Sequence, residues 1–172
     1  MSNRFNISPF AWLQATRRNH ALEHATLQIL ARKHPGLTGG GYSDGRGFWI
    51  VGDLRTEEVL EAAEEALTRL KAGEHALAIH PHCGTNFAVS GLAAGLAAWL
   101  AMLPGTPRSL RQKVDRLPFI ILLATLALIL ARPLGPLAQA YLTTERRPGS
   151  LRIQEVVRYP RKGIRLHRVR TM

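Results

Sequence analysis

The chain has 172 residues, which suits one domain, or one small domain with a membrane segment, and excludes several large domains. Its single cysteine, Cys83, excludes an internal disulfide and fits a reducing compartment. The net charge of +11 is uneven: residues 1–86 hold nine basic and nine acidic side chains, whereas the tail from Thr143 holds nine basic and two acidic ones. Beside an apolar segment, a basic tail favours contact with anionic lipid over contact with nucleic acid.

The first predicted element is a long helix. Ser8 and Pro9 are typical of the N-cap and of the first helical position. We expect the helix to run to about Arg32, with His34-Pro35-Gly36 ending it. An apolar cluster at its entry fits either a core contact or an anchor at the membrane interface: Phe5, Ile7, Phe10, Trp12 and Leu13.

This helix carries the motif H-x-x-E-H, formed by His20, Glu23 and His24. Spacings of three and four residues bring these side chains onto one helix surface. Two imidazoles one turn apart can hold one metal ion, and a carboxylate beside them can accept a proton from a metal-bound water. The pattern therefore predicts a metal site, while packed or surface histidines are the alternative interpretation.

Short strands and a second helix follow. Turn residues flank Phe48–Val51, which we predict to be a strand paired with residues near Leu37–Tyr42. Thr56 is predicted to cap a helix that ends at Gly73, with one apolar stripe and a glutamate-rich face toward water. Ala76–Ile79 is expected to be a short strand that leads into residues 80–86.

Two apolar runs come next. Phe87–Leu103 contains no charged side chain, and Gly91 and Gly95 form a G-x-x-x-G pattern that suits close helix packing. A second run covers Leu117–Ala131 and can extend past Arg132-Pro133 to Leu142. We predict a helical hairpin through a bilayer, with a buried helix of a soluble protein as the alternative. The glycine pattern can serve either that hairpin or self-association.

A hairpin places the N-terminal part and the tail on the same side of the membrane. The excess of basic residues in the tail predicts that this side is cytoplasmic, which implies a cell inner membrane. The loop between the runs is also basic, with Arg108, Arg111, Lys113 and Arg116 against Asp115. That loop weakens the preference without reversing it.

The tail alternates apolar and basic residues around a turn at residues 160–163, a pattern that predicts a β-hairpin with one apolar and one basic face. We expect it to pair with the earlier strands. The predicted lipid-facing basic residues are Arg152, Arg158, Arg161, Lys162 and Arg165. Tyr159 is the only aromatic residue interleaved with the basic residues of the tail, so nucleic acid is not an expected partner.

Together these elements predict an α+β fold in three parts. Residues 1–86 form an N-terminal α+β part, residues 87–142 a transmembrane helical hairpin, and residues 143–172 a basic β-hairpin that completes the cytoplasmic domain. The expected partners are the lipid bilayer and either a membrane-complex subunit or a second copy packed through Gly91 and Gly95.

We expect the first helix and residues 80–86 to meet in a site. His20 and His24 would be metal ligands, His80 or His82 a third, and Cys83 a substitute for it. Glu23 would act as a general base on a metal-bound water. Asn86 either donates to a developing oxyanion or caps the helix that follows.

The motifs Asn-His-Ala-Leu-Glu-His at 19–24 and His-Pro-His-Cys-Gly-Thr-Asn at 80–86, followed by an apolar hairpin, resemble an uncharacterised family of small bacterial membrane proteins. That resemblance implies no known activity. The H-x-x-E-H motif alone resembles inverzincin peptidases, whose third ligand is a glutamate on a downstream helix. The glutamates in a matching direction are Glu61, Glu64, Glu65 and Glu74.

Three functions are compatible with these patterns. The first is a membrane-associated zinc hydrolase, most simply a peptidase, with Glu23 as its base. The second is a non-catalytic membrane subunit whose histidines hold a structural metal, the magnesium of a tetrapyrrole pigment or a haem. The third is a scaffold whose basic domain binds anionic lipid. Zinc is the metal expected in the first case.

Overall fold

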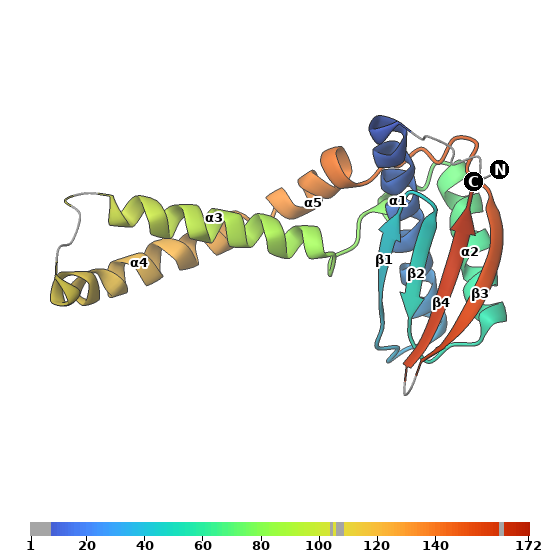
Figure 1. Ribbon diagram of the computed structural model, residues 1–172, viewed down its shortest axis with the longest axis horizontal. Helices are drawn as coiled ribbons and strands as arrows, with labels where there is room; N and C mark the ends of the chain where they lie inside the picture. The colour runs from blue at the N-terminus through green and yellow to red at the C-terminus, as the bar shows by residue number, and fades with distance from the viewer. Residues whose placement is uncertain (1–7, 104, 106–108, 162–163) are drawn as a thin grey trace, which may run out of the picture. The chain divides into compact units, whose positions relative to one another are not determined.

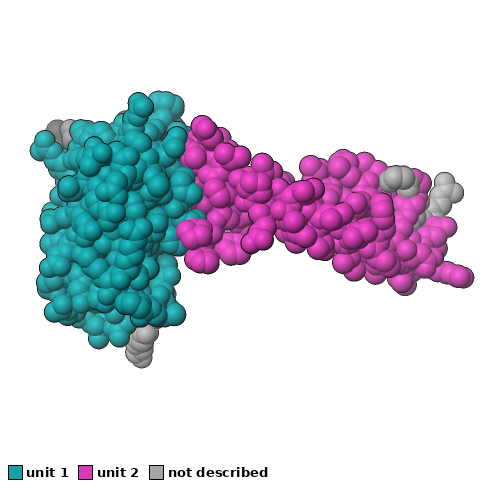
Figure 2. Space-filling view, turned by 180° about the vertical axis from the view of Figure 1, so that it is seen from behind, with its two compact units in different colours: residues 1–80, 143–172 teal, residues 81–142 magenta. Residues whose placement is uncertain are grey.

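The computed structural model describes residues 8–103, 105, 109–161 and 164–172 (Figure 1). The chain divides into two compact units (Figure 2). Unit 1 combines residues 1–80 with residues 143–172, and unit 2 consists of residues 81–142. Within the described residues, the two units together hold five α-helices and one four-stranded antiparallel sheet, which confirms the predicted α+β class.

Unit 1 contains two α-helices, a short 3₁₀ helix and the sheet. Its N-terminal segment gives α1 (Pro9–Lys33), β1 (Gly40–Asp44), β2 (Gly47–Val51), α2 (Thr56–Lys71) and the 3₁₀ helix η1 (His75–Ala78). Its C-terminal segment gives β3 (Ile153–Arg161) and β4 (Ile164–Thr171). The strand order is β1-β2-β4-β3, so the predicted pairing of the C-terminal hairpin with the earlier strands is confirmed.

The long helix α1 begins and ends as its sequence predicts. The Ser8 hydroxyl accepts a hydrogen bond from the backbone N–H of Ala11 at 3.2 Å, and Pro9 occupies the first turn. Arg32 and Lys33 lie in the last turn, where positive charge favours the helix C-terminus. The predicted bounds of this helix are therefore confirmed.

The second helix also forms where expected, with one correction at its start. Thr56 is its first residue, and the N-cap position belongs to Arg55 rather than to Thr56. The Glu58 carboxylate accepts a hydrogen bond from the Arg55 backbone N–H at 2.8 Å and thereby takes the capping role. Gly73, with a φ of +97°, follows the helix in the left-handed region that favours glycine.

Helices α1 and α2 lie on one face of the sheet and leave the other face uncovered (Figure 1). The strand register sets which side chains face the helices: Phe48 pairs with Val169, and Ile50 pairs with His167. All four are fully buried. They pack against the apolar residues of the helices, namely Ala21, Leu22, Ala25, Ile29, Leu30, Val59, Ala62, Ala63, Ala66 and Leu70.

The C-terminal hairpin does not divide into one apolar and one basic face, contrary to the prediction. In β4, Arg165, His167 and Val169 share the side that faces the helices, because alternate residues of a strand point the same way. Leu166 and Arg168 lie on the uncovered side. The apolar and basic residues of β4 do not follow a strict two-residue period, so each face of this strand is mixed.

The predicted strand at Ala76–Ile79 is wrong, because His75–Ala78 form a 3₁₀ helix. A side chain of α1 donates hydrogen bonds to carbonyl groups that would otherwise accept them from a neighbouring strand. The Gln28 side-chain amide donates to the carbonyl oxygens of Leu77 and Ile79, at 2.8 and 3.0 Å. The segment is therefore held to the helix by side-chain hydrogen bonds instead of by a ladder.

Unit 2 is helical. It contains α3 (Gly84–Met102), α4 (Leu110–Leu130), α5 (Leu134–Ala138) and most of the π-helical segment η2 (Gln139–Thr143). Helices α3 and α4 pack along each other (Figure 1). The cap of α3 is Cys83, whose sulfur accepts from the Thr85 backbone N–H, so Asn86 is not the cap.

Helix α3 is long and apolar enough to cross a membrane, and α4 joined to residues 134–143 through a bend of 54° forms a second candidate span. Core helices of soluble proteins meet the same test, so the criterion alone is weak evidence. Among the described residues of α3 and α4, none is buried. Gly91 and Gly95 would place a Cβ in open space, so they do not form a close contact within the hairpin.

Candidate metal centre

The histidines of the H-x-x-E-H motif lie next to each other on α1. The ring centroids of His20 and His24 are 4.2 Å apart, because a four-residue spacing stacks side chains one helical turn apart. His24 is buried and His20 is half-buried. The helix therefore presents two imidazoles at one point, as the sequence predicts.

Both rings are oriented by backbone carbonyl groups. The Nδ1 atom of His20 lies 2.9 Å from the carbonyl oxygen of Thr143, and that of His24 lies 2.7 Å from the carbonyl oxygen of Ala78. A carbonyl oxygen only accepts, so each Nδ1 carries the hydrogen. In the neutral ring, Nε2 then holds the lone pair. This is the arrangement that orients histidines as metal ligands in proteins.

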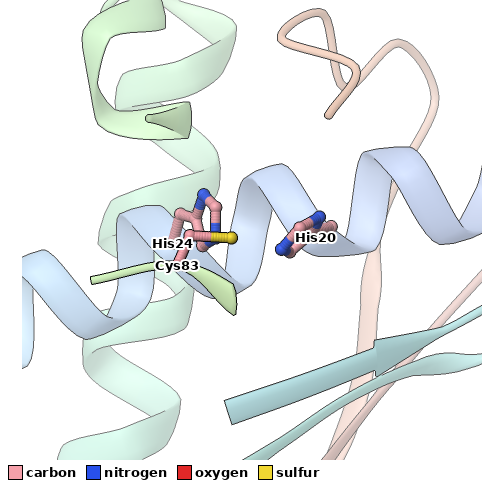
Figure 3. Close-up of side chains that lie close together, drawn as sticks. All are labelled: His20, His24 and Cys83. Carbon is pink, nitrogen blue, oxygen red and sulfur yellow. The ribbon is translucent and has the colours of Figure 1, made fainter. Parts of the chain in front are cut away.

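Cys83 completes a group of three possible ligands (Figure 3). One ligand atom from each of His20, His24 and Cys83 lies within 4.8 Å of the other two. Cys83 is buried and stands at the N-terminus of α3, where the helix dipole stabilises negative charge such as that of a thiolate. Two imidazoles and one thiolate form a ligand set that suits zinc.

The other predicted ligands lie outside this group of three. The His80 ring is half-buried, with its centroid 5.6 Å from that of His24. His82 is exposed, whereas the neighbouring Cys83 is buried. The alternation of exposed His82 and buried Cys83 explains why the cysteine joins the histidines of α1.

Glu23 is buried between α1 and β1. Its Oε2 atom accepts a short hydrogen bond from the Ser43 hydroxyl, and a Cβ placed on Gly41 would collide with its carboxylate. The glycine therefore leaves the room that the carboxylate fills. Ser43 and Gly41 were not predicted as parts of the site. Gly41 belongs to a run of three glycines and Ser43 to the turn residues that follow it, and neither pattern identifies Glu23 as the neighbour.

Asn86 is held within unit 2. Its side-chain amide donates to the Pro81 carbonyl oxygen at 2.7 Å, and its Oδ1 atom accepts from the Gln139 side chain at 2.6 Å. A Cβ on Gly135 would meet Asn86, so α5 approaches the start of α3 closely. These contacts give Asn86 a structural role in joining two helices.

Two of the downstream glutamates, Glu65 and Glu74, form ion pairs with basic side chains. The Glu65 carboxylate lies 2.8 Å from the Lys33 ammonium group, whose hydrogen bond lowers the pKa of Glu65. The Glu74 carboxylate lies 2.7 Å from the Arg69 guanidinium, which lowers the pKa of Glu74 in the same way. Glu61 and Glu64 are exposed. The inverzincin arrangement of a downstream glutamate ligand is therefore not reproduced among these residues.

The predicted lipid-facing residues are exposed where the structure describes them. Arg152 and Arg158 are exposed, and the Arg165 guanidinium binds Asp53 at 2.8 Å. Lys162 and the side chain of Arg161 lie outside the described residues. Arg158 and Arg165 lie toward the turn of the β3–β4 hairpin, whereas Arg152 precedes β3 at the other end.

Comparison with known proteins places the chain in a family. The domain of unknown function DUF6391 matches residues 15–156, which include His20, His24 and Cys83. An uncharacterized protein of Picosynechococcus sp. is 36% identical over 154 residues, which cover 81% of this chain and 70% of that protein. No solved structure matches the chain. The chain therefore belongs to the DUF6391 family.

Proposed function

We propose that this protein is a membrane-associated metal-binding protein that holds zinc with His20, His24 and Cys83. The observation that carries the proposal is the approach of three ligand atoms to within 4.8 Å of one another. Carbonyl groups of Thr143 and Ala78 orient the two imidazoles as ligands require. Nitrogen and sulfur donors in this number favour zinc over magnesium or calcium, which prefer oxygen.

Two roles follow for such a metal. Three protein ligands leave a fourth position for water, which is the arrangement of catalytic zinc sites, and Glu23 is the carboxylate of the H-x-x-E-H motif. This supports a zinc hydrolase acting on peptides. The second role is a non-catalytic metal or tetrapyrrole site in a membrane subunit. It is favoured by the Ser43 hydrogen bond and the Gly41 contact, which engage the Glu23 carboxylate against β1.

The membrane location rests on α3. Its 19 residues are mostly apolar and include no charged side chain, and none of them is buried, so a lipid or protein partner must cover its surface. The exposed arginines near the β3–β4 hairpin suit the anionic cytoplasmic face of an inner membrane. In this proposal, unit 1 and the metal lie on the cytoplasmic side.

Metal content tests the first part of the proposal. The full chain is purified in detergent without chelator, and zinc per chain is measured by elemental analysis. We expect about one zinc per chain, lost in His20→Ala and in Cys83→Ser. Serine is a favoured N-cap residue, so Cys83→Ser keeps the start of α3 while removing the thiolate. The control is His34→Ala, at the end of the same helix. Unchanged zinc in both ligand variants would overturn the site.

Glu23→Gln separates the two roles. In a hydrolase, this variant keeps zinc and loses peptide hydrolysis, because an amide does not accept the proton of a metal-bound water. In a structural site, zinc remains and no zinc-dependent hydrolysis is seen in either protein. A visible absorbance band in the purified wild-type protein, lost in His20→Ala, would replace zinc by a tetrapyrrole.

Self-association through α3 is a further part of the proposal. Gly91 and Gly95 are exposed and would meet nothing with an added Cβ, which leaves their small surface available to a second helix. We expect Gly91→Leu to shift a detergent-solubilised dimer toward monomer in sedimentation experiments. Ala93→Leu, on another side of the helix, is the control. A monomeric wild-type protein would contradict this part.

A further inference from the structure

A hollow of about 600 Å³ lies on unit 1, and none of the residues that line it is one of the proposed metal ligands. Side chains of β2, β3 and β4 line it together with Trp12 of α1. Trp49, Tyr159 and Arg168 line it from the side of the sheet that α1 and α2 leave uncovered, as the strand register shows. Its volume is in the range of small-molecule binding sites in proteins.

Aromatic rings form one part of this hollow. The centroids of Trp49 and Tyr159 are 5.1 Å apart at an interplanar angle of 63°, although the two residues are 110 positions apart in sequence. Trp12 contributes a third ring, which packs on Gly45 so closely that an added Cβ there would collide with it. The rings are partly exposed, so they offer stacking surface to a planar ligand.

Guanidinium groups form the other part. Arg168 lies over the Trp49 ring at 5.1 Å, and Arg46 lies over the Trp12 ring at 5.9 Å. Arg168 is only 7% exposed, and its Nη2 atom binds the Asp44 carboxylate at 2.7 Å. Its Nη1 atom is buried and has no hydrogen-bond partner among the residues that the structure describes.

An unpartnered donor on a buried cation is costly, so such an atom indicates a missing acceptor. The acceptor must be anionic or strongly polar, because it would bind a guanidinium. The Trp49 ring lies against that guanidinium, and Tyr159 and Trp12 also line the hollow, so the rest of the ligand must be planar and apolar on its faces. A lipid headgroup supplies the anion without the ring. The rings and the orphaned donor together therefore define the ligand class.

We propose that this hollow binds a nucleoside monophosphate. The base stacks against Trp49 and Tyr159, and the phosphate accepts hydrogen bonds from Arg168 Nη1 and from the exposed Arg46. Two of the three arginines that line the hollow already pair with carboxylates, Arg168 with Asp44 and Arg170 with Glu155. Among the described residues that line the hollow, one unpaired arginine, Arg46, remains to bind a phosphate, whereas a nucleic acid strand would need a longer row of unpaired cations.

The test uses the full chain in detergent and a panel of the four ribonucleoside 5′-monophosphates. Binding is followed by titration calorimetry and by quenching of tryptophan fluorescence. We expect at least one of the four to bind, and both its free nucleoside and inorganic phosphate to bind about tenfold more weakly or less. A ten-residue single-stranded RNA and phosphatidylglycerol, added to the micelles, are the competing ligands.

Variants then locate the site. Arg46→Gln is exposed and keeps the backbone N–H that donates to Asp44, so its fold is expected to be unchanged. We expect it and Arg168→Gln to weaken nucleotide binding about tenfold. Arg152→Gln, an exposed arginine outside the hollow, is the matched control and should bind as the wild type does. His20→Ala should also bind normally, which separates this site from the metal.

Several results would overturn the proposal. No binding by any of the four nucleotides would do so. Equal binding of phosphate would leave an anion site without a base, and competition by phosphatidylglycerol at matched affinity would make it a lipid site. Tight RNA binding without nucleotide binding would make the surface a nucleic-acid platform. Loss of binding in Arg152→Gln equal to that in Arg46→Gln would place the ligand elsewhere.

Discussion

The His24 Nδ1 atom lies 2.7 Å from the carbonyl oxygen of Ala78, a residue 54 positions later in the chain. This contact joins the centre of α1 to η1, the segment that leads into His80 and Cys83. Because Gln28 binds the neighbouring carbonyls of Leu77 and Ile79, the same face of α1 holds the whole segment. The orientation of the histidine thus depends on a 3₁₀ helix that the sequence alone did not indicate.

Gln28 should therefore influence metal binding without being a ligand. In Gln28→Leu, the carbonyls of Leu77 and Ile79 lose their donor, and η1 loosens beside His24. We expect zinc affinity to fall about tenfold while zinc per chain at saturation stays unchanged. A competition titration with a chromophoric chelator measures this. Gln14→Leu, on the same helix but outside the η1 contact, is the control, and equal affinity of both variants and the wild type would contradict the role.

Gly41 should be intolerant of any side chain. In Gly41→Ala, the new methyl group would collide with the Glu23 carboxylate, which is buried and bound to Ser43. Gly41 itself is exposed, but the atoms that the methyl group would meet belong to buried Glu23, so we expect a loss of about 1–3 kcal/mol of stability. Thermal unfolding in detergent measures the change. Gly40→Ala is the matched control, since its added Cβ meets nothing within 4 Å. Equal melting temperatures for the two variants would be inconsistent with the contact.

His167 should make the stability of unit 1 depend on pH. It is fully buried on the helix-facing side of β4, and burial, followed by repulsion from Arg158 and Arg165, lowers its pKa below the usual 6.5, with Glu57 opposing the shift. The unfolded chain therefore binds a proton that the folded chain does not. The free energy of unfolding therefore falls as the pH drops below about 6.5, because protonation of His167 favours the unfolded chain. Above that pH His167 is neutral in both states, and this loss of stability is absent.

His167→Leu should remove this pH dependence of the stability. Both ring nitrogens are buried and lack hydrogen-bond partners among the residues described, so an apolar replacement stabilises the fold by about 1 kcal/mol at neutral pH. The difference in stability between the variant and the wild type should grow from pH 7.5 to pH 5.5, measured by denaturant unfolding. A difference that stays constant over this range would show that His167 titrates alike in both states.

The hydrogen bond from Ser43 to Glu23 gives a fourth prediction. Ser43→Ala removes a donor from a buried carboxylate, and we expect a loss of about 1–3 kcal/mol of stability. Ser90→Ala, in α3, is the control for a serine away from this site. Thermal unfolding of both variants measures the effect. Equal stability of the two would mean that other groups satisfy the carboxylate.

Much of the fold could be predicted because its signals are local. Ser8, Pro9 and the final basic turn specify where α1 begins and ends, and a glycine after α2 stops that helix. The spacing of His20 and His24 alone brings their rings to one helix surface. Alternation and turn residues likewise predicted both hairpins of the sheet. Each of these features depends on neighbours within one or two turns of the chain.

What the tertiary structure decided are the contacts between distant segments. It placed buried Cys83, instead of exposed His82, beside the histidines of α1. It also brought Trp49 next to Tyr159 by pairing both of their strands with β4, and it buried His167 where the tail appeared simply basic. Such outcomes depend on strand register and on which carbonyl groups need donors. Both are set by the packing of the whole unit, so no local pattern encodes them.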